Sequence, residues 1–299
     1  MGTVVDSVAS RERPLPKTTS RLSVLEAWHL LSLDAPTVAA LWSTFFARAM
    51  QVSLPWHSQM ILALGTWLIY VADRILDGYR LCPGTRLHER HLFHARHRVA
   101  FLCAAVVVCG ILVWLIVEKM FPGARREDAF LFLLSLLYLF FVHKPAGKNR
   151  SWLPKELAVG VVFAAATAVP AWSRIESGRL TLLPAVALFA ALCWLNCIAI
   201  ERWENEFVPD GFASSNVTTL WAAQHLRPAA IILAAISGLM CAITGARSLP
   251  VALVYAAAAC SCSVFVIVDR KRERYSAIHL RILADLALLT PLLVLPFQS

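Results

Sequence analysis

Two carboxylates close an apolar stretch of the chain in the segment Asp73-Arg74-Ile75-Leu76-Asp77. In a helix, Asp73 and Asp77 stand at i and i+4, so their Cβ atoms share one face about 5–6 Å apart. Two anions at that distance repel each other unless a cation lies beside them. Carboxylate oxygens suit Mg²⁺ that is shared with phosphate oxygens. A solvated helix end, with Asp73 paired to a nearby Arg, explains the same spacing, and both interpretations stay open.

A second acidic group lies between Asn196 and Glu206. Glu201 and Glu204 stand at i and i+3 and share a helix face, whereas Glu206 points away from Glu204 if the helix continues. Asn196 lies about a turn and a half before Glu201, where an amide needs a partner or a ligand. A hydrogen bond between helices is an equally open explanation of Asn196. Glu201 and Glu204 are therefore candidate metal ligands.

Three cations, Lys144, Lys148 and Arg150, stand in a loop that contains Pro and Gly. Such a group anchors loops to anionic lipid or grips a polyphosphate. Next to two carboxylate groups, it is typical of a diphosphate site, where metals and Lys or Arg neutralise a leaving phosphate. The candidate contacts of the diphosphate are Arg74, Lys144, Lys148 and Asn196.

The composition places these residues in a membrane. The 299 residues are 59% hydrophobic and 16% charged, with a mean hydropathy of +0.64. Soluble domains have about 45–50% apolar and about 25% charged residues, so an ordinary soluble domain is excluded. A spanning helix needs about 20 apolar residues. Nine runs are predicted to span, namely 35–54, 56–76, 99–118, 127–143, 155–173, 181–201, 228–246, 248–268 and 280–297.

These runs predict an all-α integral membrane protein. We expect residues 1–34 to form a cytoplasmic segment with an amphipathic interfacial helix at 20–33, and residues 35–299 to form one membrane-embedded domain. Asp73-Arg74 and Glu201-Arg202 stand 128 residues apart, at corresponding ends of the second and sixth spans. This spacing hints at a four-helix unit repeated twice and followed by a ninth helix.

The basic residues predict the orientation of the chain. With the N-terminus inside, the inner segments hold 21 of the 28 Lys and Arg residues and the outer segments hold 6. This excess is the positive-inside pattern. It predicts a cytoplasmic N-terminus, both acidic groups on the cytoplasmic face, and a C-terminus on the opposite side of the cell inner membrane. The net charge of +9 then reflects orientation and diphosphate attraction, and it no longer favours nucleic acid as a partner.

Taken together, these motifs resemble the UbiA superfamily of intramembrane prenyltransferases. The resemblance rests on the Asp-Arg-x-x-Asp of the second span, the acidic group of the sixth, nine spans, and the Tyr138, Lys144, Lys148 stretch before Gly160. It covers residues 35–297, with specific motifs at some twenty positions. It implies a helical bundle around a central cavity, an isoprenoid diphosphate held through Mg²⁺, and transfer of the prenyl chain to a small lipophilic or aromatic acceptor.

The family's first motif, Asn-Asp-x-x-Asp-x-x-x-Asp, falls on Ile69, Tyr70, Asp73 and Asp77, so its last two acids are present. Tyr70 stands where an acid is usual, and by the resemblance it faces the reacting carbon or steers the acceptor. Glu201 and Glu204 stand where aspartates are usual. The resemblance thus implies catalytic roles for Asp73, Asp77 and Tyr70, and metal ligation by Asp73, Asp77, Glu201 and Glu204.

Two other functions are compatible with the same residues. Terpene cyclisation on this scaffold would capture the allylic cation within the donor chain, and only its product would differ. A non-catalytic lipid-binding or transport protein would keep the fold and lose a metal site. The replacement of the leading Asn-Asp by Ile69 and Tyr70 favours this last alternative, whereas the two acidic groups on one face disfavour it.

Overall fold

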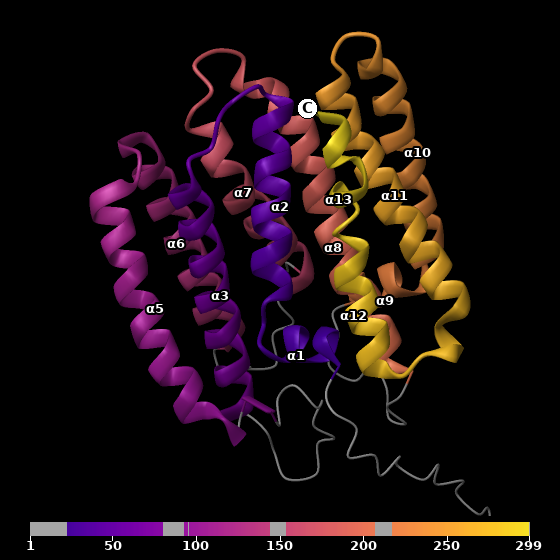
Figure 1. Cartoon of the computed structure of the whole chain (residues 1–299). Helices are drawn as coiled ribbons and strands as arrows, with labels where there is room; N and C mark the ends of the chain where they lie inside the picture. The colour runs from indigo at the N-terminus through magenta and orange to yellow at the C-terminus, as the bar shows by residue number, and fades with distance from the viewer. Residues whose placement is uncertain (1–22, 80–92, 95, 144–153, 207–216, 299) are drawn as a thin grey trace, which may run out of the picture.

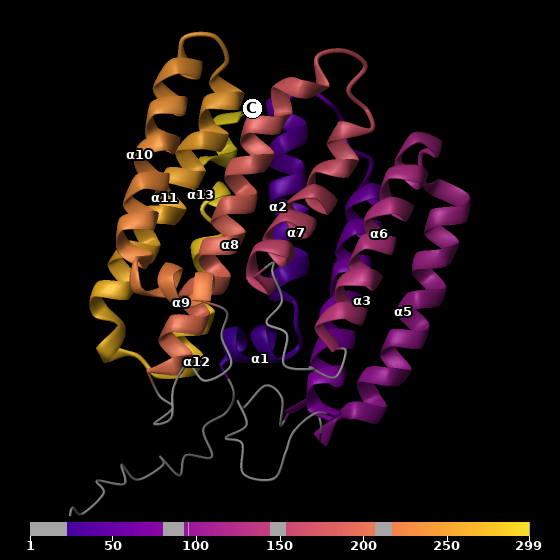
Figure 2. The ribbon, with the colours of Figure 1, turned by 180° about the vertical axis from the view of Figure 1, so that it is seen from behind.

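Long apolar runs in lipid must pair their backbone polar groups internally, which makes helix the expected structure. The structure is a computed structural model that describes residues 23–79, 93–94, 96–143, 154–206 and 217–298. Over these ranges it contains helices and no strand. Long helices that follow one another in the sequence run alternately up and down in one bundle (Figures 1 and 2). The helices are α1 (Val24–Leu30), α2 (Asp34–Ala49), α3 (Trp56–Tyr79), α5 (Arg98–Lys119), α6 (Pro122–His143), α7 (Lys155–Trp172), α8 (Leu183–Asn205), α9 (Val217–Gln224), α10 (Leu226–Gly245), α11 (Leu249–Lys271), α12 (Ala277–Ala287) and α13 (Pro291–Val294), with 3₁₀ turns at Arg179–Leu182, Arg272–Arg274 and Leu295–Gln298.

Each of the nine apolar runs expected from the sequence overlaps a helix, but run 35–54 continues five residues beyond α2, and run 280–297 is divided among α12, α13 and the last 3₁₀ turn. In the described residues, seven helical stretches are long and apolar enough to cross a membrane, or eight if α1 and α2 form one bent span. Helix α2 alone has only 16 residues, and α6 has Arg125, Arg126, Glu127 and Asp128 in its first two turns. The chain therefore has the make-up of a membrane protein, and nine spans remain a prediction.

Helices α5 and α10 form opposite sides of the bundle (Figure 1), and both carry exposed apolar side chains. Val106 on α5 is 73% exposed, and Ile232 on α10 is 59% exposed. Helix α11 is half buried by comparison. Apolar surfaces of this extent suit contact with lipid chains rather than with water.

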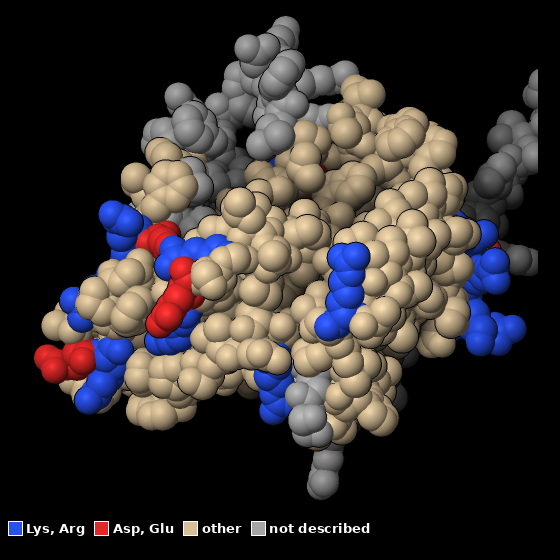
Figure 3. All heavy atoms as spheres, turned by 90° about the horizontal axis from the view of Figure 1, so that it is seen from above, with Lys and Arg blue, Asp and Glu red and all other residues tan. Residues whose placement is uncertain are grey.

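The helix directions agree with the prediction that the second, fourth, sixth and eighth apolar runs all end on the same side of the bundle. Helices α3, α6, α8 and α11 all end at the end of the bundle where α1 lies, and the C-terminus lies at the opposite end (Figure 1). Figure 3 looks onto that opposite end, and most of the surface in view carries neither acidic nor basic side chains. The assignment of the α1 end to the cytoplasm stays a prediction.

Helix α1 lies across the end of the bundle and makes an angle of 91° with α2. It begins with a capping box, in which Ser23 Oγ accepts from the Glu26 N–H and Glu26 accepts from the Ser23 N–H. Ser32 at the corner has a φ of 60°. A helix was expected within residues 20–33, and its place at a membrane surface remains a prediction. The bend turns His29 into the protein, where it is buried.

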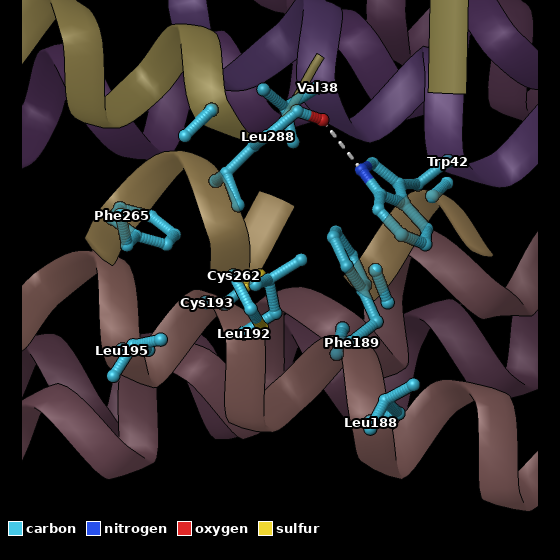
Figure 4. Packing of buried hydrophobic residues seen from close by; sticks show 14 of the residues in the cluster. Val38, Trp42, Leu188, Phe189, Leu192, Cys193, Leu195, Cys262, Phe265 and Leu288 are labelled. Carbon is cyan, nitrogen blue, oxygen red and sulfur yellow. Dashed lines mark hydrogen bonds between the residues drawn. The ribbon is translucent and has the colours of Figure 1, made fainter. Parts of the chain in front are cut away.

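The main core lies between α2, α7, α8, α11 and α12. The indole ring of Trp42 stacks on Phe189, with 4.3 Å between ring centroids. Its Nε1 donates to the carbonyl of Leu288, 2.8 Å away (Figure 4). This hydrogen bond satisfies the polar atom of a fully buried side chain and ties α2 to the end of α12.

A polar contact joins α8, α10 and α11 near the α1 end. Asp269 is fully buried and accepts from Trp203 Nε1 at 2.9 Å and from Arg227 Nε at 2.5 Å. Arg202 Nε lies 3.4 Å from the same carboxylate. A buried carboxylate is stable only when it is paired in this way. The paired side chains therefore fix the end of α8, the helix that carries Glu201 and Glu204.

Helices α7 and α8 approach closely at Gly160. A Cβ at this position would lie 2.9 Å from the carbonyl oxygen of Ala190 and 2.9 Å from the amide nitrogen of Trp194. Both atoms belong to the α8 backbone, which cannot rotate away as a side chain does. The pair of helices therefore depends on a residue without a side chain at position 160.

We expect Gly160→Ala to destabilise the protein by about 1–3 kcal/mol, because the added methyl forces α7 away from α8. The matched control is Gly238→Ala in α10, where a Cβ meets nothing within 4 Å. That change should be neutral or stabilising by about 0.5–1 kcal/mol, since Ala replaces a helical Gly. Thermal unfolding of the purified protein in detergent measures both, and equal effects would contradict the close approach.

Candidate functional site

A cavity lies between α2, α3, α7, α8 and α12. Its empty space is about 390 Å³, including the part that is open to the outside. Four lining residues are polar or acidic, and the rest are apolar, aromatic or thiol side chains. We call this space the central cavity, and it is lined by Asp34, Ala35, Val38, Tyr70, Val159, Phe163, Cys193, Asn196, Cys197, Asp285 and Leu288.

Two carboxylates and an imidazole meet at the polar end of this cavity. His29 Nδ1 lies 2.9 Å from Asp34 Oδ2 and 3.4 Å from Asp285 Oδ2. The three residues come from α1, α2 and α12, so the contact joins both ends of the described chain. His29 and Asp34 are buried and Asp285 is partly buried. We call this group the His29–Asp34–Asp285 cluster.

Arg74 supports the cluster from α3. It donates to the carbonyl oxygen of His29 at 3.1 Å and to Ser32 Oγ at 2.5 Å, and its Nη2 lies 3.7 Å from Asp34 Oδ2. Ser32 also contacts His94 Nε2 at 3.3 Å. The sequence predicted that Arg74 binds diphosphate. In the structure its buried guanidinium holds the corner between α1 and α2, and the diphosphate contact stays a prediction.

Asn196 contributes to the central cavity from α8. Its Nδ2 donates to Asp285 Oδ1 at 3.3 Å, which is the hydrogen bond between helices that the sequence left open. Its Oδ1 is buried and accepts from no group in the described part of the chain. Asn196 therefore offers one acceptor oxygen beside the cluster, toward a space that both carboxylates also line.

The predicted acidic residues continue the cavity-lining faces of α3 and α8. Tyr70 lines the cavity, and Asp73 stands one turn further along α3 on the same face. Cys197 lines it from α8, and Glu201 and Glu204 follow at i+4 and i+7. Glu204 Oε1 lies 2.7 Å from Arg281 Nη2 on α12. By helical periodicity, the faces of α3 and α8 that line the cavity thus continue toward these acidic residues.

Three predicted site residues fall outside the described part of the structure, namely Lys144, Lys148 and the side chain of Asp77. Among described residues, three ligand atoms of His, Cys, Asp or Glu lie within 4.8 Å of one another only in the His29–Asp34–Asp285 cluster. Asp73, Glu201 and Glu204 belong to no such group.

Sequence reasoning missed His29, Asp34, Asp285 and Arg281 as site residues. The signal for two of them was present, because Arg281 and Asp285 are charged residues inside the apolar run 280–297. Ionisable residues within a spanning helix usually face the bundle interior and carry a function. Asp34 was placed in the cytoplasmic segment, but it is the first residue of α2.

Three comparisons with known proteins found no relative. No family model matches the chain, no curated protein matches it, and no solved structure matches it.

We expect Arg74→Gln to destabilise the protein by about 3–5 kcal/mol, because it leaves Asp34 buried with one cation fewer. The control is Arg179→Gln, whose contact with Glu127 at 4.0 Å is partly exposed and worth less than about 1 kcal/mol. Denaturation in detergent measures both variants. A similar small loss in the two would show that Arg74 does not hold the α1–α2 corner.

Proposed function

We propose that the protein transfers a prenyl group from an isoprenoid diphosphate to a small lipophilic or aromatic acceptor within the membrane, as a divergent UbiA-type enzyme. One observation carries the proposal. The faces of α3 and α8 that line the central cavity continue, within one to two turns, into Asp73, Glu201 and Glu204. An apolar cavity that leads to carboxylates on two helices suits a lipid whose polar group is a diphosphate.

The polarity of the cavity supports the placement of such a lipid. Helices α2 and α12 run away from the α1 end, so Val38 and Leu288 lie deeper than Asp34 and Asp285. Phe163 contacts Tyr70, with 6.4 Å between ring centroids. The isoprenoid chain would occupy this deeper apolar part, and the diphosphate would face the α1 end. There the enclosed, water-poor surroundings favour capture of an allylic cation by the acceptor.

The donor set fits the metal that the resemblance implies. Mg²⁺ takes one or two carboxylates and completes its octahedron with water and substrate phosphates, so it needs no three-carboxylate cage. Asp73 and Glu201 are the residues we assign to it, whereas Glu204 is engaged by Arg281. When bound, Mg²⁺ neutralises the diphosphate and eases cleavage of the carbon–oxygen bond. Tyr70 would position the reacting carbon from the wall of the cavity.

The orientation belongs to the same proposal. The excess of Lys and Arg in the inner segments supports a cytoplasmic α1 end and a site that opens toward soluble diphosphates and Mg²⁺. We assign the protein to the inner membrane on this basis.

We expect Asp73→Asn and Glu201→Gln each to lower Mg²⁺-dependent diphosphate release by at least about a hundredfold, since a lost metal ligand removes several kcal/mol of charge stabilisation. The assay supplies allylic diphosphates of increasing length, a pool of phenols and quinol precursors, and membranes that contain the protein. Glu206→Gln is the matched control. Its carboxylate bonds Arg272 at 2.8 Å on the exposed end of α8, so activity should stay unchanged.

Product analysis separates the alternatives. A prenylated acceptor supports transfer, whereas a cyclised hydrocarbon or alcohol formed without acceptor identifies a cyclase. Binding of the allylic diphosphate that needs no Mg²⁺, without turnover, would replace the proposal with a lipid-binding function. Unchanged turnover in Asp73→Asn would remove Asp73 from the site.

A further inference from the structure

The geometry of the His29–Asp34–Asp285 cluster matches that of atoms that share one metal ion. A metal bound about 2.0–2.2 Å from its nitrogen and oxygen ligands separates neighbouring ligand atoms by about 3.0–3.5 Å. His29 Nδ1 lies 2.9 Å from one carboxylate oxygen and 3.4 Å from the other. All three ligand atoms lie within 4.8 Å of one another. The three side chains therefore stand where a single cation could contact each of them.

The charges around the cluster leave Asp285 short of positive partners. Asp34 has Arg74 at 3.7 Å, whereas Arg281 pairs with Glu204 at 2.7 Å. Among described residues, Asp285 has no Lys or Arg nitrogen within 4 Å, and its side chain is only 20% exposed. A carboxylate in such surroundings needs a positive partner or a proton of its own. Two occupants satisfy it, namely a proton, on His29 or on Asp285 itself, or a metal ion between the three residues.

Asn196 adds an observation that favours the metal ion. Only 9% of Asn196 is exposed, and its Oδ1 accepts no hydrogen bond from the described chain while its Nδ2 donates to Asp285. A proton on His29 does not serve this oxygen, because His29 Nδ1 already points at the carboxylates, and a separate water would have to fill the place. A metal ion, or a water bound to it, supplies the group that the oxygen needs together with the charge that Asp285 needs.

We propose that His29, Asp34 and Asp285, with Asn196 beside them, bind one divalent transition-metal ion such as Mn²⁺, Fe²⁺ or Zn²⁺. One imidazole nitrogen with carboxylate and amide oxygens suits these ions better than Mg²⁺, which prefers oxygen and water. Arg74 acts as the supporting partner that orients Asp34.

The ion would connect four helices that are distant in sequence. His29 lies on α1, Asp34 on α2, Asn196 on α8 and Asp285 on α12. A second space of about 260 Å³, which includes its open part, adjoins the cluster between α1, α2 and α12. Asp34, Val38 and Asp285 line both this space and the central cavity. Bound metal would thus hold α1 over the polar end of the central cavity. This site is independent of the prenyl-transfer proposal, which assigns Mg²⁺ to Asp73 and Glu201.

The test is a cobalt titration of the full-length protein, purified in detergent and stripped with a chelator. Co²⁺ reports its own ligands through visible absorption. We expect one equivalent to bind, with an excess of Mg²⁺ unable to displace it. His29→Gln and Asp285→Asn should each weaken binding by at least about tenfold, given that even indirect supporting partners contribute that much.

Two variants serve as controls for the cobalt titration. His57→Gln changes an imidazole at the opposite end of the bundle and should leave cobalt binding unchanged, as should Asp73→Asn. Loss of cobalt binding in Asp73→Asn with retention in Asp285→Asn would place the ion at the diphosphate site and overturn the proposal. Absence of cobalt binding in the wild type would also overturn the proposal. That result would leave a proton as the occupant of the cluster.

A measurement on the wild-type protein covers the case in which the variants fail to fold. A ligand that binds only the folded state raises its unfolding temperature as the ligand concentration increases. Added Mn²⁺ or Zn²⁺ should therefore raise the unfolding temperature, and a chelator should reverse the shift. No shift with any of these ions, at concentrations that saturate an ordinary site, would contradict the proposal.

Discussion

Buried charge that must be neutralised inside an apolar bundle is the constraint that organises this structure. An unpaired carboxylate in such a medium costs several kcal/mol, so its partners are fixed wherever it is buried. Asp34 receives His29 from α1 and Arg74 from α3, and Asp269 receives side chains from α8 and α10. Apolar contacts allow neighbouring helices to slide along one another with little change in energy, whereas these ionic contacts require particular residues to meet. The two buried aspartates thus determine where α1 and the end of α8 lie.

The same constraint separates the two ends of the central cavity. Its acidic residues Asp34 and Asp285 lie nearer the α1 end than Val38 and Leu288, which stand about one turn further along α2 and α12. Still deeper, the stacked rings of Trp42 and Phe189 fill the space between α2 and α8 (Figure 4). The cavity would therefore orient a bound molecule along one axis, with its charged groups toward α1 and its apolar groups toward the stacked rings.

Hydropathy predicted the helices because lipid leaves the backbone no alternative to internal pairing. Helical periodicity likewise placed Asp73 with Asp77, and Glu201 with Glu204, on one helix face, which depends only on local geometry. The cluster was beyond such reasoning, since His29 and Asp285 are 256 positions apart and meet only when α1 bends across the bundle. Because hydropathy was averaged over the run 280–297, the apolar neighbours of Asp285 also concealed its charge. The contacts of Arg74 were beyond such reasoning for a related reason, because its partners His29, Ser32 and Asp34 lie about 40 positions earlier in the chain.

The acidic residues near the cavity occupy two kinds of position. Asp34 and Asp285 are held by side chains of other helices, and both lie close to His29. Asp73 and Glu201 stand one turn nearer the ends of α3 and α8 than Tyr70 and Cys197, which line the cavity. The proposed metal ion would use the first kind, because a resident ion needs ligands that are already held in place. The proposed diphosphate would use the second kind, because a substrate must enter and leave.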